Sequence, residues 1–507
     1  MDSSNVMPPS DCVSLVPAFA EAWQRAPRAG LPALVGSDRM LSYGELAAEV
    51  GSLSGRLHAH GIGRGDRVAI AMQRSLPAAV ALLAVLACGA CPCVLEPRLG
   101  RDETLRRFAI TRLNRLLLDE AHAADDKLAD LPGVDRLHID ALPPAQPFWA
   151  ADIAGGDEGF LLFTSGSSGK PKGVLQSHRG LLANAAGVMR HTQLGPQDRL
   201  LHVMPLYHTN GVNNQLFAPL LAGASVVIAE RFKADEMSAL MARHRPTIIT
   251  GVPTMYSRML ACDFAPEALA SLRMARCGSA PITEELHRRV ERQLGVELLV
   301  SYGLSEATCT STMNPPGQRR IGTVGTVLAG QQVVLADGAG RPIEGPGRDG
   351  EICVDGPGLM LGYLDEQSGG RPRPIEGRLH TGDLGRFDAE GYLQITGRIK
   401  EVIIRGGENL SPNLIEEVLC RVPGVQACCV VGRPDADLGE VPWAFVVRSR
   451  DEEGLRLDDE CMGRAVTAEL SRIHKPAGYA YVEALPENSV GKVDRKLLAA
   501  RVRQPSA

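Results

Sequence analysis

Apolar residues along the chain come in short runs that alternate with longer amphipathic stretches. The spacing predicts a series of helices, at residues 41–60, 77–88, 102–111, 179–191, 211–222 and 234–244. Between them lie apolar runs typical of buried strands, at residues 68–72, 93–95, 115–118, 199–203, 224–229, 247–250 and 274–277. Ser42, followed three residues later by Glu45, predicts a capping box at the first of these helices. Such alternation indicates an α/β fold of parallel sheets covered by helices.

The pattern changes twice along the chain. Residues 325–362 form short apolar stretches between Gly and Pro turns, which indicates a β-rich subdomain. Residues 398–412 then separate a large N-terminal domain, 1–397, from a small C-terminal domain, 398–507. The small domain alternates predicted elements and is expected to be an α+β lid, with helices at 412–422 and 465–473 and strands at 425–431 and 441–447. The segment before residue 41 is predicted to be a loose, Ser- and Pro-containing opening.

Residues 76–95 carry no charge over about the length that crosses a bilayer. The stretch is rich in Ala and Cys and contains Pro77, Gly89 and Pro92. A strand pattern, G-x-G-D-R-V-A-I, precedes it at residues 63–70. A buried helix followed by a buried strand is therefore favoured over a membrane span.

Composition excludes several classes of function. The chain has 507 residues, enough for two or more domains, and a net charge of −5 that does not suggest nucleic acid binding. Of its 12 cysteines, Cys88 and Cys91 form the only C-x-x-C pair, and no nearby histidine or second pair completes a zinc site. Buried thiols are favoured, and no signal peptide is recognised, so the cytoplasm is the predicted compartment.

Residues 160–180 hold the strongest candidate for a binding loop. An apolar strand leads into T-S-G-S-S-G-K-P-K-G, whose glycines, hydroxyls and two lysines suit a polyphosphate. It is not a Walker A loop, because only two residues separate its glycines and Pro171 follows the lysine. By composition alone, a solvated surface loop remains an alternative.

The loop resembles the signature loop of the adenylate-forming superfamily, which includes acyl-CoA synthetases, peptide-synthetase adenylation domains and firefly luciferases. Further motifs of that family recur in order over nearly the whole chain, at residues 302–308, 381–383, 397–412 and 491–495. The resemblance implies a large nucleotide-binding domain and a mobile lid. It also implies ATP, Mg²⁺ and CoA as the cofactors and a carboxylic acid as substrate.

The resemblance implies an ATP site in which the loop grips the β- and γ-phosphates. Tyr302 would lie against the adenine, Asp383 would accept both ribose hydroxyls, and Glu306 with Thr164 would hold Mg²⁺, which favours carboxylates and substrate phosphates. The full set of implied ATP-binding residues is Thr164, Ser165, Gly166, Ser167, Ser168, Gly169, Lys170, Lys172, Gly278, Ser279, Ala280, Tyr302, Gly303, Ser305, Asp383 and Arg398.

Two lysines of the small domain have implied roles. Lys492, in N-S-V-G-K-V-D-R-K, resembles the lysine that bridges the carboxylate and the α-phosphate. Lys400 resembles the hinge about which the lid swings between an adenylating and a thioester-forming pose. Gly406 and Gly407 resemble the glycines that face the pantetheine tunnel in the second pose. From local sequence alone, both lysines read as solvated.

His208, in M-P-L-Y-H, resembles the aromatic gate at the acyl pocket of acyl-CoA synthetases, although a core histidine would look the same. That motif has no Asp to hold an α-amine, so an amino acid substrate is disfavoured. The implied acyl pocket consists of His208, Asn213, Asn214, Val252, Met255, Cys277 and Gly303. Arg258 is the one nearby cation considered for a second carboxylate, and a surface role is favoured for it. The family's aromatic before H-T-G-D is replaced by Arg378 and Leu379.

The sequence therefore predicts an ATP-dependent acid–CoA ligase that forms an acyl-adenylate and then a thioester, acting on a largely apolar monocarboxylic acid. Alternatives are a ligase that loads an acyl carrier protein, a small-dicarboxylate CoA ligase and a silent binding module. Retention of Lys492, Glu306 and Asp383 together argues against the last. No nucleic acid partner and no membrane span are expected, and a homodimer is left open.

Overall fold

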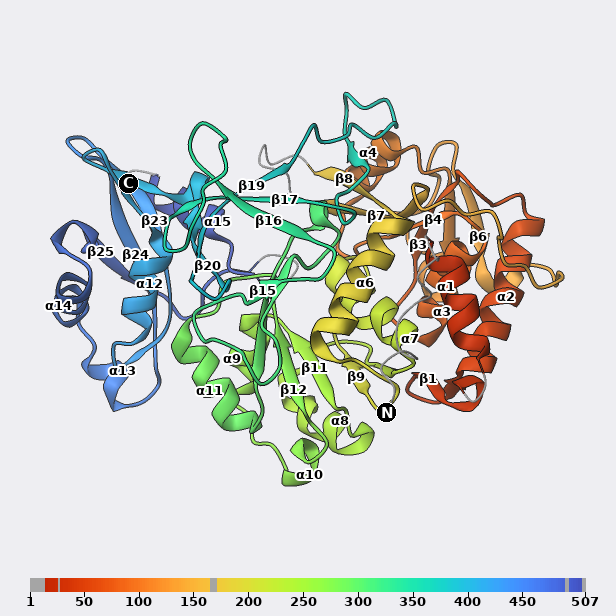
Figure 1. The fold of residues 1–507 in the computed structure, drawn as a ribbon, viewed down its shortest axis with the longest axis horizontal. Helices are drawn as coiled ribbons and strands as arrows, with labels where there is room; N and C mark the ends of the chain where they lie inside the picture. The colour runs from red at the N-terminus through yellow and green to blue at the C-terminus, as the bar shows by residue number, and fades with distance from the viewer. Residues whose placement is uncertain (1–13, 26–27, 165–170, 488–491, 504–507) are drawn as a thin grey trace.

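The computed structural model describes residues 14–25, 28–164, 171–487 and 492–503. Within these residues the chain forms five β-sheets, four in the large N-terminal part and one in the small C-terminal domain. The small domain, blue in Figure 1, lies at one end of the molecule. The predicted α/β fold with a small α+β domain is confirmed.

A four-stranded parallel sheet follows the first long helices, in the order β4-β3-β5-β6. Ser42 caps α2 with the predicted capping box, since its side chain accepts the N–H of Glu45 and the Glu45 carboxylate accepts that of Ser42. The elements are β3 (Arg67–Ala71), β4 (Cys91–Val94), β5 (Arg115–Leu118), β6 (Asp135–His138), α2 (Tyr43–Ala59), α3 (Leu76–Ala87), α4 (Arg101–Thr111) and α5 (Glu120–Ala123).

A nine-stranded sheet carries the centre of the large domain. Its order is β15 (Thr326–Val327), β14 (Thr312–Met313), β13 (Leu298–Tyr302), β12 (Met274–Cys277), β11 (Ile248–Gly251), β9 (Arg199–His202), β10 (Ser225–Ile228), β1 (Pro32–Val35), β2 (Met40–Ser42). The strands from β13 to β1 are parallel, as predicted. The edge strands β2, β14 and β15 are antiparallel. Residues 36–39, which join β1 to β2, are too few for a parallel crossover.

Helices and helical turns cover this sheet. They are α1 (Leu15–Gln24), α6 (His178–Thr192), the π-helix η4 (Asn210–Phe217), α7 (Ala218–Ala222), η5 (Ala234–Glu236), α8 (Met237–His244), α9 (Pro253–Met259), α10 (Pro266–Leu269) and α11 (Glu284–Leu294). The parallel strands end at one edge of the sheet, where a crevice for ligands is expected in folds of this kind.

Two antiparallel sheets stand beside this edge. One joins β7 (Glu158–Thr164), β8 (Lys172–Ser177) and β18 (Gly362–Leu364). The other, in the predicted β-rich subdomain, has the order β16 (Gln332–Ala336), β17 (Gly350–Asp355), β19 (Leu379–Phe387), β20 (Leu393–Arg398). A 3-10 turn, η7 (Ile399–Glu401), then leads into the small domain.

The small domain pairs a five-stranded sheet with helices, as predicted. Its strands are β21 (Ile403–Arg405), β22 (Glu408–Leu410), β23 (Val425–Asp435), β24 (Gly439–Arg448) and β25 (Gly478–Tyr481). Its helices are α12 (Pro412–Cys420), α13 (Glu452–Arg456), α14 (Asp459–Glu469) and α15 (Arg495–Arg503). The predicted helix at 465–473 begins earlier, because Asp458 accepts the N–H of Cys461 and caps α14 at its start.

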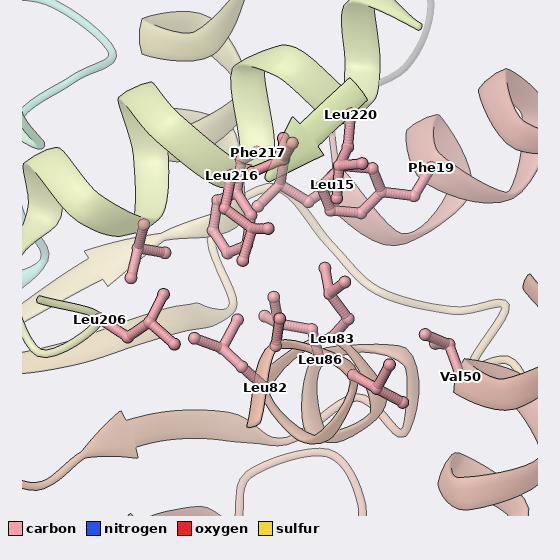
Figure 2. Close-up of a cluster of buried hydrophobic side chains, with 14 of the residues drawn as sticks. Leu15, Phe19, Val50, Leu82, Leu83, Leu86, Leu206, Leu216, Phe217 and Leu220 are labelled. Carbon is pink, nitrogen blue, oxygen red and sulfur yellow. The ribbon is translucent and has the colours of Figure 1, made fainter. Parts of the chain in front are cut away.

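The uncharged stretch around residues 76–95 lies in the core, as the sequence predicted. Figure 2 shows Leu82 and Leu83 of α3 facing Leu216 and Phe217 of η4, with Leu15 of α1 beside them. A helix that is apolar on every side is stable only when it is buried on every side. No helix in the described part of the chain is long and apolar enough to cross a membrane.

Two predicted segments need correction. The opening described as loose contains α1, whose apolar stripe Leu15, Phe19 and Trp23 is fully buried at a helical spacing of four. The predicted helix at 211–222 is instead a π-helix followed by a short α-helix. Pro219 lies at the start of α7, where it has no N–H to continue a regular α-helical ladder.

Candidate active site

Two residues from other strands, Tyr302 and Arg398, contact the carboxylate of Asp383. Asp383 on β19 lies opposite Arg398 on β20, whose Nε donates to Asp383 Oδ1 at 2.6 Å. Tyr302, the last residue of β13, donates its hydroxyl to Asp383 Oδ2 at 2.8 Å. Burial, together with the charge of Asp383, raises the pKa of Tyr302 well above its usual value, so the hydroxyl keeps the proton it donates. The three residues predicted around the nucleoside are thus in direct contact.

Backbone at the ends of β12 and β13 is packed so closely that side chains would not fit. A Cβ on Gly303 would lie 1.8 Å from the carbonyl oxygen of Cys309, and one on Gly278 would lie 2.7 Å from a serine hydroxyl of β13. Ser279 adopts a φ of 69°, in the left-handed region. Non-glycine residues held there cluster at functional sites. The backbone of residues 278–280 therefore has a tightly constrained conformation, next to the strand that ends at Tyr302.

Glu306 lies on the 3-10 turn η6 (Ser305–Ala307) and accepts a hydrogen bond from the Tyr363 hydroxyl on Oε1 at 3.0 Å. Lys172 Nζ lies 4.9 Å from the centre of the Tyr363 ring. Gln176 holds the turn in place, because its Nε2 donates to the carbonyls of Ser305 and Thr308 at 2.8 and 3.0 Å. Sequence reasoning missed Tyr363 and Gln176, which act across strands and lie outside the motifs.

Thr164 and Lys172 flank the predicted phosphate loop. They lie opposite each other at the ends of β7 and β8. The six residues between them that were predicted to contact phosphate, Ser165 to Lys170, lie outside the described part of the chain, as does Gly491. The described end of β8 lies on the side of Glu306, because Lys172 contacts Tyr363, whose hydroxyl donates to Glu306.

Lys492 brings the small domain into this site. Burial lowers its pKa, the nearby charge of Arg398 lowers it further, and the charges of Asp383 and Glu306 act in the opposite direction. The ammonium is therefore near two carboxylates and one guanidinium of the predicted ATP site. Arg495, three residues on, pairs with Glu416 of α12 at 2.5 Å and with Glu401 of η7 at 3.2 Å, which anchors the segment that carries Lys492.

His208 is a neutral, partly buried imidazole. Burial lowers its pKa to about 4, and the positive charges of Lys492 and Arg107 contribute. Its Nε2 is enclosed and has no hydrogen-bond partner in the described structure. A neutral ring is compatible with the predicted acyl pocket, because it does not add a charge that would compete for the carboxylate.

The structure does not gather all seven predicted acyl-pocket residues on one face of the nine-stranded sheet. Val252, Met255 and Cys277 belong to a hydrophobic core under α8, α9 and α11. Asn213 and Asn214 lie on η4, on the other side. Asn213 Nδ2 donates to Asn184, Asn214 Nδ2 donates to Thr310 Oγ1, both at 2.9 Å, and no described donor reaches either side-chain oxygen.

Sequence reasoning also missed a buried cation near Asn214. Arg276 lies within β12, in the run 274–277 that was taken as apolar, and only 2% of it is exposed. Its Nη2 donates to the carbonyl oxygen of Asn214 at 3.1 Å. The available signal was the arginine itself, because a charge inside a buried strand needs a specific reason.

Comparisons with known proteins show the family of this chain. Residues 19–364 match the family model described as AMP-binding enzyme, and residues 414–492 match that described as AMP-binding enzyme C-terminal domain. The chain belongs to the AMP-binding enzyme family.

Relatives of this AMP-binding enzyme include characterised ligases. The sulfoacetate–CoA ligase of Cupriavidus necator is 36% identical over 91% of this chain and 93% of its own length. The ATP-bound structure of MatB from Rhodopseudomonas palustris has a TM-score of 0.86 at 29% identity and covers 96% of this chain and 99% of MatB. The Bacillus subtilis o-succinylbenzoate–CoA synthetase with ATP and magnesium has a TM-score of 0.81 at 27% identity, covering 95% and 98%. The predicted class, an ATP-dependent acid–CoA ligase, is confirmed.

Arg258 joins the two domains and does not enter the site. Its side chain is exposed, and its Nη2 lies 2.7 Å from a carboxylate oxygen of Glu487 in the small domain. The surface role favoured for Arg258 agrees with this position. A second carboxylate on the substrate would have to displace Glu487 to reach it.

We expect the Arg258–Glu487 pair to stabilise the arrangement that brings Lys492 to the site. Exposed ion pairs contribute about 0.2–1 kcal/mol, so Arg258→Ala should slow acyl-adenylate formation about fivefold or less, and less at high salt. The adenylation rates of Arg258→Ala, Glu487→Ala and the double variant together give the coupling free energy between the two side chains. Arg456→Ala, which breaks an exposed pair with Glu452 inside the small domain, is the matched control. Additive losses would contradict a coupling between domains.

The predicted hinge residues form an exposed connection. Lys400 is the middle residue of η7, directly after Arg398 and β20. Gly406 and Gly407 form the turn between β21 and β22, with φ values of 58° and 89° that favour glycine. In this arrangement the charges of Arg398, Asp383 and Glu306 act on Lys492, and the glycine turn is exposed.

Proposed function

We propose that the AMP-binding enzyme activates its carboxylic acid between Lys492, Glu306 and Asp383 and then passes the acyl group to the thiol of CoA. The observation that carries the proposal is that the charges of Arg398, Asp383 and Glu306 act on buried Lys492, from the small domain. A site assembled from two domains can be changed by moving one of them. This suits two different reactions at one substrate carboxylate.

In the first reaction an oxygen of the substrate carboxylate attacks the α-phosphorus of ATP and pyrophosphate leaves. Two anions must approach each other, so fixed cations stabilise the charge that develops. We assign this role to Lys492 at the α-phosphate and to Lys172 near the outer phosphates. Asp383, held by Tyr302 and Arg398, would fix the ribose and therefore the position of the phosphorus.

The residues present fit a magnesium ion at Glu306. Within the described chain only one carboxylate oxygen of Glu306 takes part in a hydrogen bond, the one from Tyr363. The other oxygen is a hard ligand of the kind that Mg²⁺ takes together with substrate phosphates, and Thr164 is the second proposed ligand. When bound, the ion would neutralise phosphate charge.

In the second reaction the thiolate of CoA attacks the acyl carbonyl carbon and AMP leaves. We propose that the part of the small domain that follows Lys400 rotates about this residue, which withdraws Lys492 and brings the turn at Gly406 and Gly407 toward the site. Two glycines without side chains would let the pantetheine chain pass close to the backbone. Free CoA is the proposed acceptor. An acyl carrier protein, a homodimer and a cytoplasmic location remain sequence-based predictions.

An acid-dependent pyrophosphate-release assay tests the proposal. With ATP and Mg²⁺, a panel of carboxylic acids should release pyrophosphate, and added CoA should convert the bound acyl-adenylate to acyl-CoA. Glu306→Gln keeps the shape and removes the charge, so it should raise the Mg²⁺ concentration needed for half-maximal rate by about tenfold or more. Glu408→Gln, on the exposed strand β22, is the control. An unchanged Mg²⁺ dependence in Glu306→Gln would refute the assignment.

A further inference from the structure

The most unusual charged residue outside the ATP site is Arg276. It lies in the middle layer of the molecule, one residue before the end of β12, and is among the largest fully buried side chains in the described structure. Its position is fixed by the sheet, in register with Thr250 of β11 and Leu299 of β13. The guanidinium therefore cannot move to solvent without breaking the centre of the sheet.

Protein groups satisfy two of the three guanidinium nitrogens. Nε donates to Thr250 Oγ1 at 3.0 Å, and Nη2 donates to the carbonyl oxygen of Asn214 at 3.1 Å. Nη1 is enclosed and finds no hydrogen-bond partner among the described residues. Both existing partners are neutral, so neither offsets the positive charge.

The carboxylate whose charge acts on Arg276 is already engaged elsewhere. It belongs to Asp198, and both of its oxygens accept from Arg273, at 2.6 and 2.8 Å. Burial lowers the pKa of Arg276 to about 10, which still leaves it a cation at neutral pH. A buried charge is ordinarily paired, and an uncompensated one destabilises the fold. Among the described residues, Arg276 thus has no anion as a hydrogen-bond partner, although its position calls for one.

The position of Arg276 connects it to the acyl side of the site. The next residues along β12 lead to Gly278, whose backbone is part of the predicted ATP site, and the carboxyl ends of the parallel strands share one edge. Asn214, which accepts from Nη2, lies on η4 six residues after His208. The amide side chains of η4, at Asn210, Asn213, Asn214 and Gln215, are buried, and π-helical turns often mark functional sites.

We propose that Arg276 binds a second anionic group, a carboxylate or a sulfonate, at the far end of the acid that this enzyme activates. The inference rests on the proposed function, because it assumes that the first carboxylate is activated beside Lys492. The unpaired Nη1 supplies a donor, and the substrate anion supplies the missing charge. The unpaired side-chain oxygens of Asn213 and Asn214 suit water or a hydroxyl on the same acid. The substrate is then a short dianionic acid, in place of the largely apolar acid predicted from sequence.

A length series of matched acids tests the inference on the full-length protein. Pyrophosphate release is measured with succinate, glutarate, adipate and 3-sulfopropionate, and with butyrate, valerate and hexanoate of the same chain lengths. We expect one of the dianionic acids to have a kcat/KM at least about tenfold above its monoanionic partner. The preferred length reports the distance between the two anion sites.

Variants at Arg276 connect that preference to the guanidinium. Arg276→Met should lower the ratio of kcat/KM for the best dianionic acid to that for its partner by about 10²-fold, because the anion loses a buried charged donor. Arg276→Lys should retain part of the ratio. Arg289→Met, at an exposed position of α11, is the matched control and should leave the ratio unchanged.

Stability separates a ligand-binding role from a structural one. Replacing an unpaired buried charge by an apolar side chain of similar size is often neutral or stabilising, so Arg276→Met should melt at the wild-type temperature or above it in the absence of acid. The best dianionic acid alone should raise the melting temperature of the wild type, and its monoanionic partner should not. If Arg276→Met does not fold, three other measurements test the second-anion site. They are the substrate preference of the wild type, its melting-temperature shift with the dianionic acid, and the kcat/KM ratio of Arg276→Lys.

The outcomes separate the two proposals. The second-anion site would be overturned if the wild-type enzyme preferred the monoanionic acids. It would also be overturned if the ratio of the two kcat/KM values in Arg276→Met equalled that of the wild type. Either result would leave acid–CoA ligation intact. Wild-type enzyme that releases no pyrophosphate with any acid of either series, yet is stabilised by ATP, would instead overturn the proposed function.

Discussion

Replacing Lys492 by alanine is expected to abolish most acyl-adenylate formation while leaving thioester formation from supplied acyl-adenylate largely intact. The charges of Arg398, Asp383 and Glu306 act on this ammonium. In the proposed mechanism, charge builds on the α-phosphate beside it only during the first reaction. Loss of one fixed donor at such a charge costs about 10²–10³ in rate. Pyrophosphate release and conversion of synthetic acyl-adenylate with CoA measure the two reactions separately.

The neighbouring Lys496 offers a matched control. It lies on α15 with an exposed side chain, so Lys496→Ala removes the same charge from the same segment without reaching the site. Both reactions should proceed at wild-type rates in that variant. Equal losses in the two reactions of Lys492→Ala would contradict its assignment to adenylation, because a group used in only one pose cannot slow both by the same factor.

The sequence predicted correctly those features of the fold that depend on residues close together in the chain. The capping box at Ser42 formed because its two hydrogen bonds lie within four residues. The buried helix α3 followed from an unbroken apolar run, and the grouping of Tyr302, Asp383 and Arg398 followed from motifs that resemble a known family. In each case the information lay within one short segment or in its resemblance to other sequences.

The features that were missed depend on residues far apart in the chain. Tyr363 reaches Glu306 across 57 positions, and Arg276 reaches Asn214 across 62. Whether Arg276 is paired depends on Asp198 being taken by Arg273, which no pattern within β12 can reveal. The π-helix η4 has apolar and amide residues in an order that also suits an α-helix, so its wider turn was not predictable from periodicity.

Replacing Lys400 by proline is expected to have the opposite effect to the loss of Lys492. Lys400 is the second residue of η7, and the bond that closes this turn runs from Val402 N–H to the Arg398 carbonyl, so it does not use the Lys400 N–H. A proline there can be accommodated in the first turn, but it fixes φ at residue 400 and restricts residue 399. Adenylation should therefore stay within about threefold of wild type, since the first turn of a helix tolerates proline.

The second reaction should fall in Lys400→Pro because the small domain can no longer rotate fully. A displacement of about 1 Å at reacting atoms costs about 10²-fold, so thioester formation should drop by at least that factor. Lys400→Ala keeps the rotation and should support both reactions, which separates the hinge from the charge. Hydrogen exchange of the β21–β22 hairpin, compared between the ATP-bound and CoA-bound enzyme, should change in wild type and in Lys400→Ala but not in Lys400→Pro. An unchanged exchange pattern in the wild type would show that residue 400 is not the pivot.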